Sequence, residues 1–379
     1  MKKLRIGIAV GFLAFLFIMG AGSLFLLSEL PADQWKAAAG DTVYQKNRWV
    51  NLYGLTQKLL GKREIPDASP EYEVLRLNNG YLTFRYDVCD VKENAESTIA
   101  FQKFLEQEGI PFLYVQAPYK ISETDPQLPA GITEGSNQNA DRFLELLEEG
   151  GVPYLDLRRE IQEQGLDHYG MFYRTDHHWT TEAAFWGFTE IYEAVCERLG
   201  LEADDRITDL ENYRTEVYEG NFLGSQGRRT GIPYSGLDDM TVIRPDFSTS
   251  FQVLMPNSKR KSRKDRSGSF EEVLLYRNYM EEPDIYQRSS DMVYGDNYSL
   301  QIIRNLDEEA ADRKIFFLKD SFGRPSAAFL SLGFSEIHSI DLRKFDGLYE
   351  YIQQEKPDMV VVMYNPSRLR ERSSYEFQE

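Results

Sequence analysis

The chain has 379 residues, of which 42% are hydrophobic and 13% aromatic, and it carries a formal net charge of −18. This length and composition fit a globular protein with one large domain or two smaller ones. The acidic charge argues against a nucleic-acid partner, because phosphate groups are bound by basic surfaces, and we expect no nucleic acid.

The first segment of the chain is basic and then strongly apolar. The stretch MKKLR precedes residues 6–27, which contain no charged side chain. A helix of that length spans roughly 30 Å of hydrocarbon at about 1.5 Å per residue. We therefore expect residues 1–30 to be a signal anchor, a single transmembrane helix in the cell membrane with the C-terminal part outside the cytoplasm. The alternative is a signal peptide cleaved near residues 20–23, which would give a secreted protein.

Residues 31–92 are mostly polar and are interpreted as a stalk and a segment leading into the main domain. From residue 93 onward, helical periods alternate with short apolar runs. The helices predicted first are 93–109, 139–151 and 180–200, the last with Thr180 as its N-cap. The buried strands predicted between them are 110–118 and 152–157.

The part from about residue 201 to 306 has no clean helical period. Aromatic and β-branched runs alternate there with Gly, Pro and Ser, which predicts a long insertion of β or irregular structure. Residues 259–266 form a basic run in this acidic protein. We interpret it as a solvated hairpin loop, and the alternative is contact with an anionic glycan or lipid head group.

The alternation of strands and helices resumes near the C-terminus. The predicted strands are 314–318, 335–342 and 358–365, and the predicted helical segments are 319–333, after a turn, and 343–357. Apolar strands that alternate with helices predict a parallel sheet covered by helices on both faces. We expect an α/β domain over residues 93–379 that contains the insertion.

The two cysteines, Cys89 and Cys196, lie far apart and match no metal-binding spacing. A disulfide between them is permitted outside the cell, and two free buried thiols are the alternative.

A serine stands where the strand 314–318 ends, in the sequence KDSFG. In open parallel sheets, ligands bind outside the carboxyl ends of the strands. A serine on a sharp turn from a strand into a helix presents its hydroxyl there, beside free backbone N–H groups. Ser321 is therefore a candidate nucleophile, and a simple helix cap is the alternative.

Two of the four histidines stand side by side in the sequence YRTDHHWT. In an extended segment, side chains two residues apart point the same way, so Asp176 and His178 are expected to share one side. A carboxylate that holds an imidazole fixes its tautomer, and His178 would then take the proton of Ser321. His177 is expected to point away, and to bond the backbone or line the site. The alternative is a pair of histidines with structural roles in the core.

No metal and no cofactor are expected. Zinc sites usually have three protein ligands, and the other histidines, His168 and His338, have no suitable spacing to the pair. Asn365 follows the strand 358–365 and is a candidate donor to an oxyanion, together with the N–H of Ser321. An asparagine before proline is also an ordinary turn residue.

The sequences RTDHHWT and LKDSFG resemble those of the DHHW proteins, which are related to the SGNH (GDSL) hydrolases and to the alginate O-acetyltransferase proteins. The resemblance extends from about residue 101 to 366. It implies an SGNH-like fold that is circularly permuted: the strands 110–118 and 152–157 come last in the usual order, and the strands 314–318, 335–342 and 358–365 come first. Each site residue then lies at a strand end.

Two features depart from the usual SGNH pattern. The spacing of Asp176 and His178 is D-x-H, as in the alginate-type proteins, instead of D-x-x-H. The second strand block ends in DLRK where a glycine usually serves the oxyanion hole. Arg343 is a candidate cationic donor in its place, and a pairing with a carboxylate is the alternative.

The resemblance implies acyl chemistry on carbohydrates through Ser321, His178 and Asp176. We expect an O-acetyltransferase outside the cytoplasm that acts on a cell-surface or exported polysaccharide. Its expected partners are that polysaccharide, the membrane and a polytopic membrane O-acyltransferase that passes acetyl groups outward. One alternative is a carbohydrate or lipid esterase with the same triad. Another is an inactive glycan-binding or assembly component of a polysaccharide export system.

Overall fold

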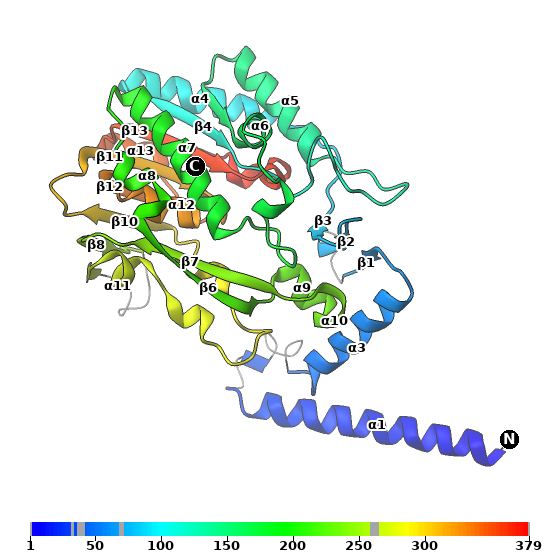
Figure 1. Ribbon diagram of the computed structural model, residues 1–379. Coiled ribbons are helices and arrows are strands. Elements are labelled where there is room, and N and C mark those ends of the chain that lie inside the picture. Colours follow the sequence, from blue (N-terminus) through cyan, green and yellow to red (C-terminus); the bar gives the residue numbers. More distant parts are fainter. Residues whose placement is uncertain (1, 32–33, 36–41, 68–71, 258–264, 378–379) are drawn as a thin grey trace.

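The computed structural model describes residues 2–31, 34–35, 42–67, 72–257 and 265–377 (Figure 1). The α-helices are α1 (Lys2–Ser28), α3 (Lys46–Leu59), α4 (Lys92–Glu108), α5 (Ser136–Glu149), α6 (Leu157–Glu163), α7 (Thr181–Leu199), α8 (Asp205–Thr208), α9 (Ser225–Thr230), α10 (Ile232–Ser235), α11 (Phe270–Leu274), α12 (Gly323–Leu330) and α13 (Leu348–Glu355). The strands are β1 (Glu64–Ile65), β2 (Val74–Arg76), β3 (Leu82–Phe84), β4 (Phe112–Gln116), β5 (Tyr154–Asp156), β6 (Tyr213–Phe222), β7 (Asp238–Pro245), β8 (Phe251–Leu254), β9 (Asp265–Gly268), β10 (Leu300–Asn305), β11 (Ala311–Lys319), β12 (Phe334–Ile340) and β13 (Met359–Tyr364).

An eight-stranded sheet with the order β5-β4-β13-β11-β12-β10-β8-β9 forms the centre of the molecule (Figure 1). The strands from β5 to β12 are parallel, and β10, β8 and β9 continue the sheet in antiparallel pairs. If β11 is counted as the first strand and β5 as the fifth, the parallel strands have the order 2-1-3-4-5 of a doubly wound fold. The chain enters that order at the fourth strand, β4. This is the circularly permuted α/β fold that the sequence predicted.

Helices cover both faces of the sheet because its central strands are apolar on both sides. Along β13, Val361 belongs to the core that contains residues of α7 and α12, whereas Val360 and Val362 belong to the core that contains residues of α4, α5 and α13. All six residues of β13 are buried. Such continuous apolar strands are typical of parallel sheets.

The caps of the long helices agree with the sequence. The side chain of Thr180 accepts a hydrogen bond from the N–H of Ala183 at the start of α7, as predicted. Gly109 and Gly200 follow α4 and α7 in the left-handed conformation, with φ angles of 73° and 65°. A glycine adopts this conformation without the steric cost of a Cβ atom.

The insertion contains more regular structure than expected. β6 and β7 form a separate antiparallel ribbon, and short helices, α8 to α11, connect the strands. β8, β9 and β10 join the central sheet, so the insertion widens the sheet instead of lying beside it. Most of the basic run at 259–266 lies outside the described residues. Within β9, the guanidinium of Arg266 lies over the ring of Tyr276, 4.4 Å from its centroid.

The segment interpreted as a stalk also contains folded structure. α3 packs against α9 and α10, and β1, β2 and β3 form a small antiparallel sheet beside them (Figure 1). A Cβ atom on the buried Gly54 would lie 1.8 Å from the carbonyl oxygen of Thr230, so α3 approaches α9 as closely as a glycine permits. From α3 onward the chain is therefore part of the folded body.

The N-terminal helix α1 contains a span of residues, Ile6–Ser28, that is long and apolar enough to cross a membrane. None of this span is buried in the molecule. Its length and composition fit a signal anchor or a signal peptide. Cys89 and Cys196 are both free thiols, so the open question of a disulfide between them is answered in the negative.

Candidate active site

Three side chains from two distant parts of the chain form a continuous hydrogen-bonded line. Nε2 of His178 lies 2.7 Å from Oγ of Ser321, and Nδ1 of His178 lies 2.5 Å from Oδ1 of Asp176. Asp176 and His178 are buried, whereas Ser321 is partly exposed. In this arrangement the imidazole can accept the serine proton while the carboxylate fixes the imidazole tautomer. The structure thus brings together the three residues that the sequence predicted.

Ser321 lies on the turn that leads from β11 into α12. The carboxylate of Asp320 accepts hydrogen bonds from the N–H of Phe322 and the N–H of Asn365, both at 2.9 Å, and so ties the ends of β11 and β13 together. Nε1 of Trp179 donates to the carbonyl oxygen of Phe322 at 3.1 Å. These bonds fix the serine turn against the DHHW segment, because Trp179 is the last residue of that motif.

Asp176 is charged because the groups around its carboxylate lower its pKa more than burial raises it. Burial alone would raise the pKa of its carboxyl, but the two neighbouring imidazoles and the N–H of Ser225 lower that pKa well below the usual range. Oδ1 accepts from the N–H and Nδ1 of His178, and Oδ2 accepts from the N–H of Ser225 at 2.5 Å. Both oxygens are therefore occupied, and the carboxylate is held in one orientation.

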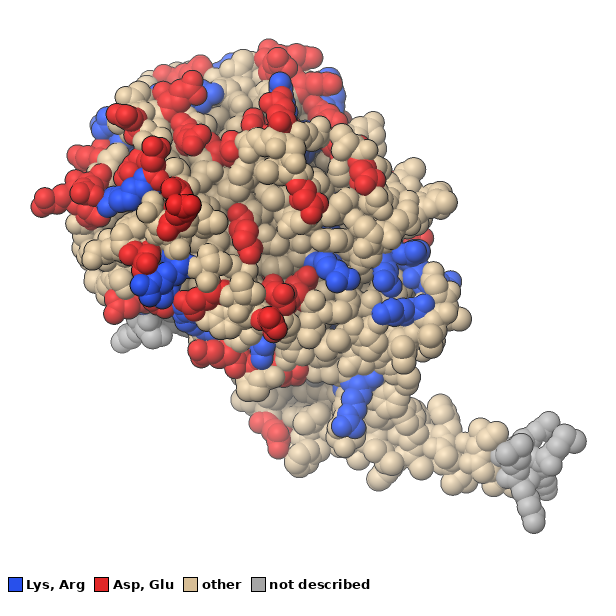
Figure 2. Space-filling view, in the orientation of Figure 1, with Lys and Arg blue, Asp and Glu red and all other residues tan. Residues whose placement is uncertain are grey.

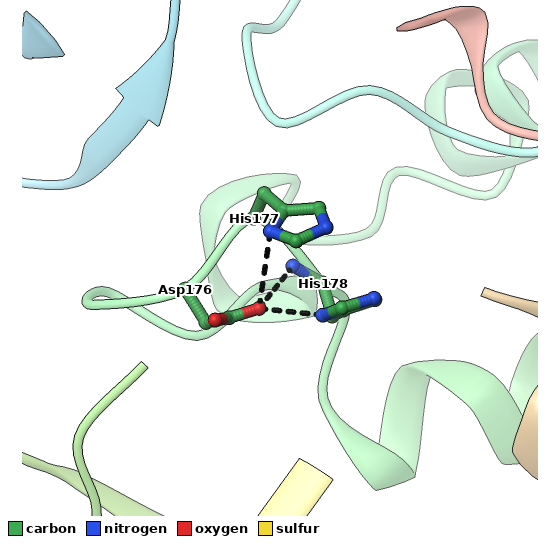
Figure 3. Close-up of side chains that lie close together, drawn as sticks. All are labelled: Asp176, His177 and His178. Carbon is green, nitrogen blue, oxygen red and sulfur yellow. Dashed lines mark hydrogen bonds and ion pairs between the residues drawn. The ribbon is translucent and has the colours of Figure 1, made fainter. Parts of the chain in front are cut away.

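The prediction that His177 points away from Asp176 is wrong. Figure 3 shows both imidazoles turned toward the Asp176 carboxylate, and Nδ1 of His177 lies 3.4 Å from Oδ1. The reason is that the segment is a tight bend and not an extended strand, with the N–H of Tyr173 donating to the carbonyl oxygen of His178. Nδ1 of His177 also lies 3.2 Å from Oγ of Ser225, and burial lowers the pKa of His177 below its usual value.

Asn365 is buried at the end of β13. Its Nδ2 donates to the carbonyl oxygen of Pro118 at 2.9 Å, and its Oδ1 accepts from the N–H of Ser367 at 3.1 Å. These two bonds fix the amide and leave one Nδ2 hydrogen for another acceptor.

Arg343 donates two hydrogen bonds to Asp341, from Nε at 2.8 Å and from Nη2 at 2.7 Å. This pair is the alternative that the sequence left open for Arg343. The hydrogen bonds with Asp341 raise the pKa of the guanidinium, so it is always charged.

Sequence reasoning missed an arginine beside the serine and histidine. Nε of Arg324 donates to the carbonyl oxygen of Ser321 at 3.0 Å, and Nη2 lies 3.5 Å from Nε2 of His178. Asp291 holds the same guanidinium with an ion pair of 2.9 Å. Arg324 follows the serine turn directly, but only the geometry of α12 shows that its side chain folds back onto the site.

Sequence reasoning also missed the buried Lys120, which follows β4. Its Nζ donates to the carbonyl oxygen of Leu82, at 2.6 Å, and to that of Asp176. Lys120 is 1% exposed, and burial lowers its pKa to about 7. The lysine thus connects the small sheet to the backbone of the DHHW segment.

The stability of the protein is expected to rise between pH 7 and 9 because of Lys120. The pKa of a lysine in the unfolded chain is about 10.4, so in this range the unfolded state binds a proton that the folded state releases. The slope has an upper limit of about 1.4 kcal/mol per pH unit for each such lysine. Urea unfolding at several pH values measures it. Lys120→Met should flatten the rise of the free energy of unfolding with pH, whereas substitution of the exposed Lys103 by Met should not. An unchanged slope in Lys120→Met would show that Lys120 does not cause the rise.

Gly224 lies directly against Asp176. A Cβ atom at this position would be 2.3 Å from Cβ of Asp176 and 2.5 Å from the carbonyl oxygen of Thr175. Gly224→Ala is therefore expected to displace Asp176, to lower stability by about 1–3 kcal/mol and to reduce turnover of the acetyl esters that the motifs lead us to expect as substrates well beyond that loss. Thermal melts and turnover at saturating substrate measure both effects.

Gly150→Ala is the matched control for that substitution. Its Cβ atom would also make a short contact, 2.5 Å, but with the flexible end of Ile99 and not with the DHHW segment. This variant should keep its turnover even where its melting temperature falls. Equal losses of turnover in both variants would show that the effect of Gly224→Ala is one of general stability.

Two groups of side chains lie close enough to share a metal ion among the described residues. One is Asp176, His177 and His178, whose nitrogen and oxygen atoms already bond one another and Ser321. The other is Glu336, His338 and Glu355, and there Lys314 and Arg304 balance the carboxylates. In both groups the geometry is explained by hydrogen bonds and ion pairs.

One small hollow adjoins Ser321 and His178, and a larger one lies at Ser225. The smaller, of about 20 Å³, is lined by Tyr173, His178, Met240, Tyr294, Ser321 and Arg324 among others. The larger, of about 1130 Å³, is lined by residues 43–50, 225–229 and 284–287 in part, and includes Lys46, Arg48, Arg228 and Arg229. Ser225 lines this larger groove and contacts both Asp176 and His177, so the groove lies on the Asp176 side of the site.

Comparison with known proteins places this geometry in context. Residues 81–235 match the family model described as "SGNH hydrolase-like domain, acetyltransferase AlgX". This range contains the DHHW segment and Ser225 but ends before Ser321. No curated protein matches the chain significantly.

Solved structures share the fold over most of the chain. Bacillus cereus PatB1 aligns with a TM-score of 0.64 at 20% identity and covers 80% of this chain and 99% of its own. The structure of PatB1 with a sulfonyl adduct gives a TM-score of 0.63 at 18% identity, covering 81% of this chain and 98% of that chain. A DHHW family protein from Eubacterium siraeum aligns with a TM-score of 0.62 at 15% identity, covering 83% of this chain and 97% of its own. The resemblance predicted from the motifs is thereby confirmed: residues 81–235 match an SGNH hydrolase-like domain of the AlgX type, and the chain shares the fold of PatB1 and of the DHHW family protein.

Proposed function

We propose that the protein is an extracytoplasmic O-acetyltransferase that modifies a cell-surface or exported polysaccharide through an acetyl-serine. The observation that carries the proposal is the hydrogen-bonded line from Ser321 through His178 to Asp176 at the carboxyl end of β11. Two features support it: the match to a domain described as an acetyltransferase, and the position of the site where ligands bind in doubly wound sheets.

The first half of the reaction forms the acetyl-serine. Oγ of Ser321 attacks the acetyl carbonyl of the donor while Nε2 of His178 takes the serine proton. The bond between the acetyl carbon and the donor oxygen then breaks, and His178 returns the proton to that oxygen. Asp176 remains charged throughout and stabilises the imidazolium.

The second half transfers the acetyl group to a sugar hydroxyl. His178 takes the proton of that hydroxyl, whose oxygen attacks the acetyl-serine, and Ser321 leaves with the proton restored. The N–H of Ser321 and the remaining Nδ2 hydrogen of Asn365 are the proposed donors to the oxyanion, each worth about 10²–10³ in rate. The N–H groups of Arg343 that Asp341 does not use are a further proposed donor set.

The two hollows are consistent with a small acyl group and a large acceptor. The pocket beside Ser321 and Arg324 has room for roughly one or two water-sized groups, which suits an acetyl group better than a long acyl chain. The groove at Ser225 has a volume of about 1130 Å³, far larger than the pocket, and carries basic side chains on its walls. We assign the pocket to the acetyl group and the groove to the polysaccharide.

The acetyl donor is proposed to come from the membrane. A domain outside the cytoplasm has no access to cytosolic acetyl donors, and α1 can hold the domain at the bilayer. A polytopic membrane O-acyltransferase that passes acetyl groups outward is the proposed partner.

The test uses the full chain in detergent with p-nitrophenyl acetate as the donor. Release of p-nitrophenol with a single acetyl adduct on Ser321, detected by mass spectrometry, is the expected result. Added polysaccharide oligomers should then become acetylated faster than acetate is released. Acetate release that oligomers do not divert would show an esterase, and a folded protein that binds oligomers without any adduct would show a binding component.

A further inference from the structure

α3 exposes a continuous apolar stripe to the surroundings. Its opposite face packs against the rest of the domain, and Gly54 on that face is buried. On the same face, Oδ1 of Asn51 accepts from the N–H of Ile232 at 3.0 Å, and Nζ of Lys58 donates to the carbonyl oxygen of Pro233 at 2.8 Å. The side chains of the stripe and their exposed fractions are Trp49 39%, Leu52 54%, Tyr53 39%, Leu59 79% and Leu60 66%. At about 100° per residue these positions share one side of the helix.

Such a stripe differs from the scattered apolar residues found on most surfaces. A contiguous exposed patch on a soluble protein usually marks a contact with a protein or a membrane. The stripe combines leucines with a tryptophan and a tyrosine, the two side chains that are enriched at membrane–water interfaces.

The position of α3 in the chain points to the membrane. Only residues 29–45 separate it from α1, and Figure 1 shows both helices at the same end of the molecule, away from α4. The N–H of Tyr44, just before α3, donates to Oγ of Ser23 in α1 at 3.0 Å, and the rings of Phe15 and Trp49 meet edge to face at 5.3 Å. α1 thus covers Trp49, at the start of the stripe, and this contact must open for α1 to span the bilayer while α3 lies at its surface.

The charges around α3 suit anionic lipid head groups. Residues 46–63 contain five basic residues and no acidic one, although the whole chain has a net charge of −18. Figure 2 shows Lys and Arg side chains gathered at this end of the molecule, whereas Asp and Glu cover much of the remaining face. A basic residue near an anionic leaflet contributes about 1 kcal/mol of attraction.

We propose that α3 is a second membrane contact, which lies in the plane of the bilayer surface with its apolar stripe among the lipids. Lys46, Arg48 and Lys62 contact the anionic head groups. The contact turns the groove at Ser225 toward the membrane, because residues 43–50 form one wall of that groove. This inference concerns the orientation of the domain and does not depend on the proposed acetyl transfer.

The experiment places an environment-sensitive fluorophore on a single cysteine at Leu59 of the full chain, reconstituted in vesicles that contain phosphatidylglycerol. Cys89 is replaced by serine, and Cys196 is buried. The label is expected to show a blue-shifted emission that lipids carrying a quencher on the acyl chain suppress. The matched control is Leu306→Cys, whose side chain is 55% exposed on the loop after β10, and its label should show neither effect.

Two results would overturn the inference. Emission typical of water at Leu59 in vesicles would show that the stripe faces solvent. A blue shift that lipid quenchers do not suppress would show that protein covers the stripe, either α1 or a second copy of the chain. Dilution of the protein in the vesicles distinguishes these two, because only a second copy is lost on dilution.

Discussion

Ser321→Ala is expected to abolish acetyl-enzyme formation and to lower the turnover of acetyl esters by at least about 10³-fold. The alanine lacks the Oγ atom that lies 2.7 Å from Nε2 of His178, so no oxygen can carry the acetyl group. The change removes one atom from a partly exposed position, so the fold should persist. Turnover of p-nitrophenyl acetate and the intact mass after incubation with donor measure the two effects.

Ser335→Ala is the matched control. Oγ of Ser335 lies 3.1 Å from the carbonyl oxygen of Arg313 and 3.4 Å from Oδ1 of Asp312, and it can donate its proton to either of them. A sulfonyl fluoride provides a second measurement: an activated serine displaces fluoride and forms a sulfonate ester. Wild type and Ser335→Ala should each gain one sulfonyl group, and Ser321→Ala should gain none. A Ser321→Ala protein that still forms an acetyl adduct would refute the serine mechanism.

The parallel sheet could be predicted because each of its elements has a complete local signal. β4 and β13 are runs of buried and mostly apolar residues, and α4 and α7 end at glycines with positive φ angles. The order in space then follows from the permuted resemblance, since β11 with the serine turn takes the place of the first strand. The apolar periodicity and the glycines at the helix ends were sufficient to predict these strands and helices.

The parts that sequence reasoning missed depend on contacts between distant segments. α3 reads as a polar segment, and its place is set by the approach of Gly54 to the carbonyl oxygen of Thr230. β10 lies in the part of the chain that has no clean helical period, and its place is set by its pairing with β12. Such contacts cannot be predicted from the local sequence pattern of either partner, so α3 was interpreted as part of a stalk and β10 as part of an irregular insertion.

The candidate site also has a part that could be predicted from the sequence and a part that could not. Ser321, His178 and Asp176 could be predicted because a motif and a strand end mark them. The direction of His177 could not, because Asp238 bends the segment by accepting from the N–H groups of Arg174 and Thr175, both at 2.8 Å. These bonds join residues that no motif connects.

Asp176→Asn is expected to lower turnover by roughly 10³–10⁴-fold while Ser321 and His178 remain in place. If the asparagine Oδ1 faces Nδ1 of His178, its Nδ2 meets the N–H of Ser225, and two donors face each other. If the amide is reversed, Nδ2 donates to His178 and places the imidazole proton on Nε2, which then cannot accept the serine proton.

The control for that substitution is Asp238→Asn, because the Asp238 carboxylate binds the same segment through Thr175 without touching the imidazoles. Both variants should lose stability, but only Asp176→Asn should lose most of its turnover per folded molecule.

The dependence of stability on acid pH gives a second measurement of the role of the Asp176 charge. Since the pKa of Asp176 is held below its unfolded value, its contribution to stability is present above about pH 4 and is lost as the pH falls further. Asp176→Asn should remove that part of the acid dependence, and a variant that keeps both turnover and acid dependence would show that the Asp176 charge serves neither the imidazole nor the fold.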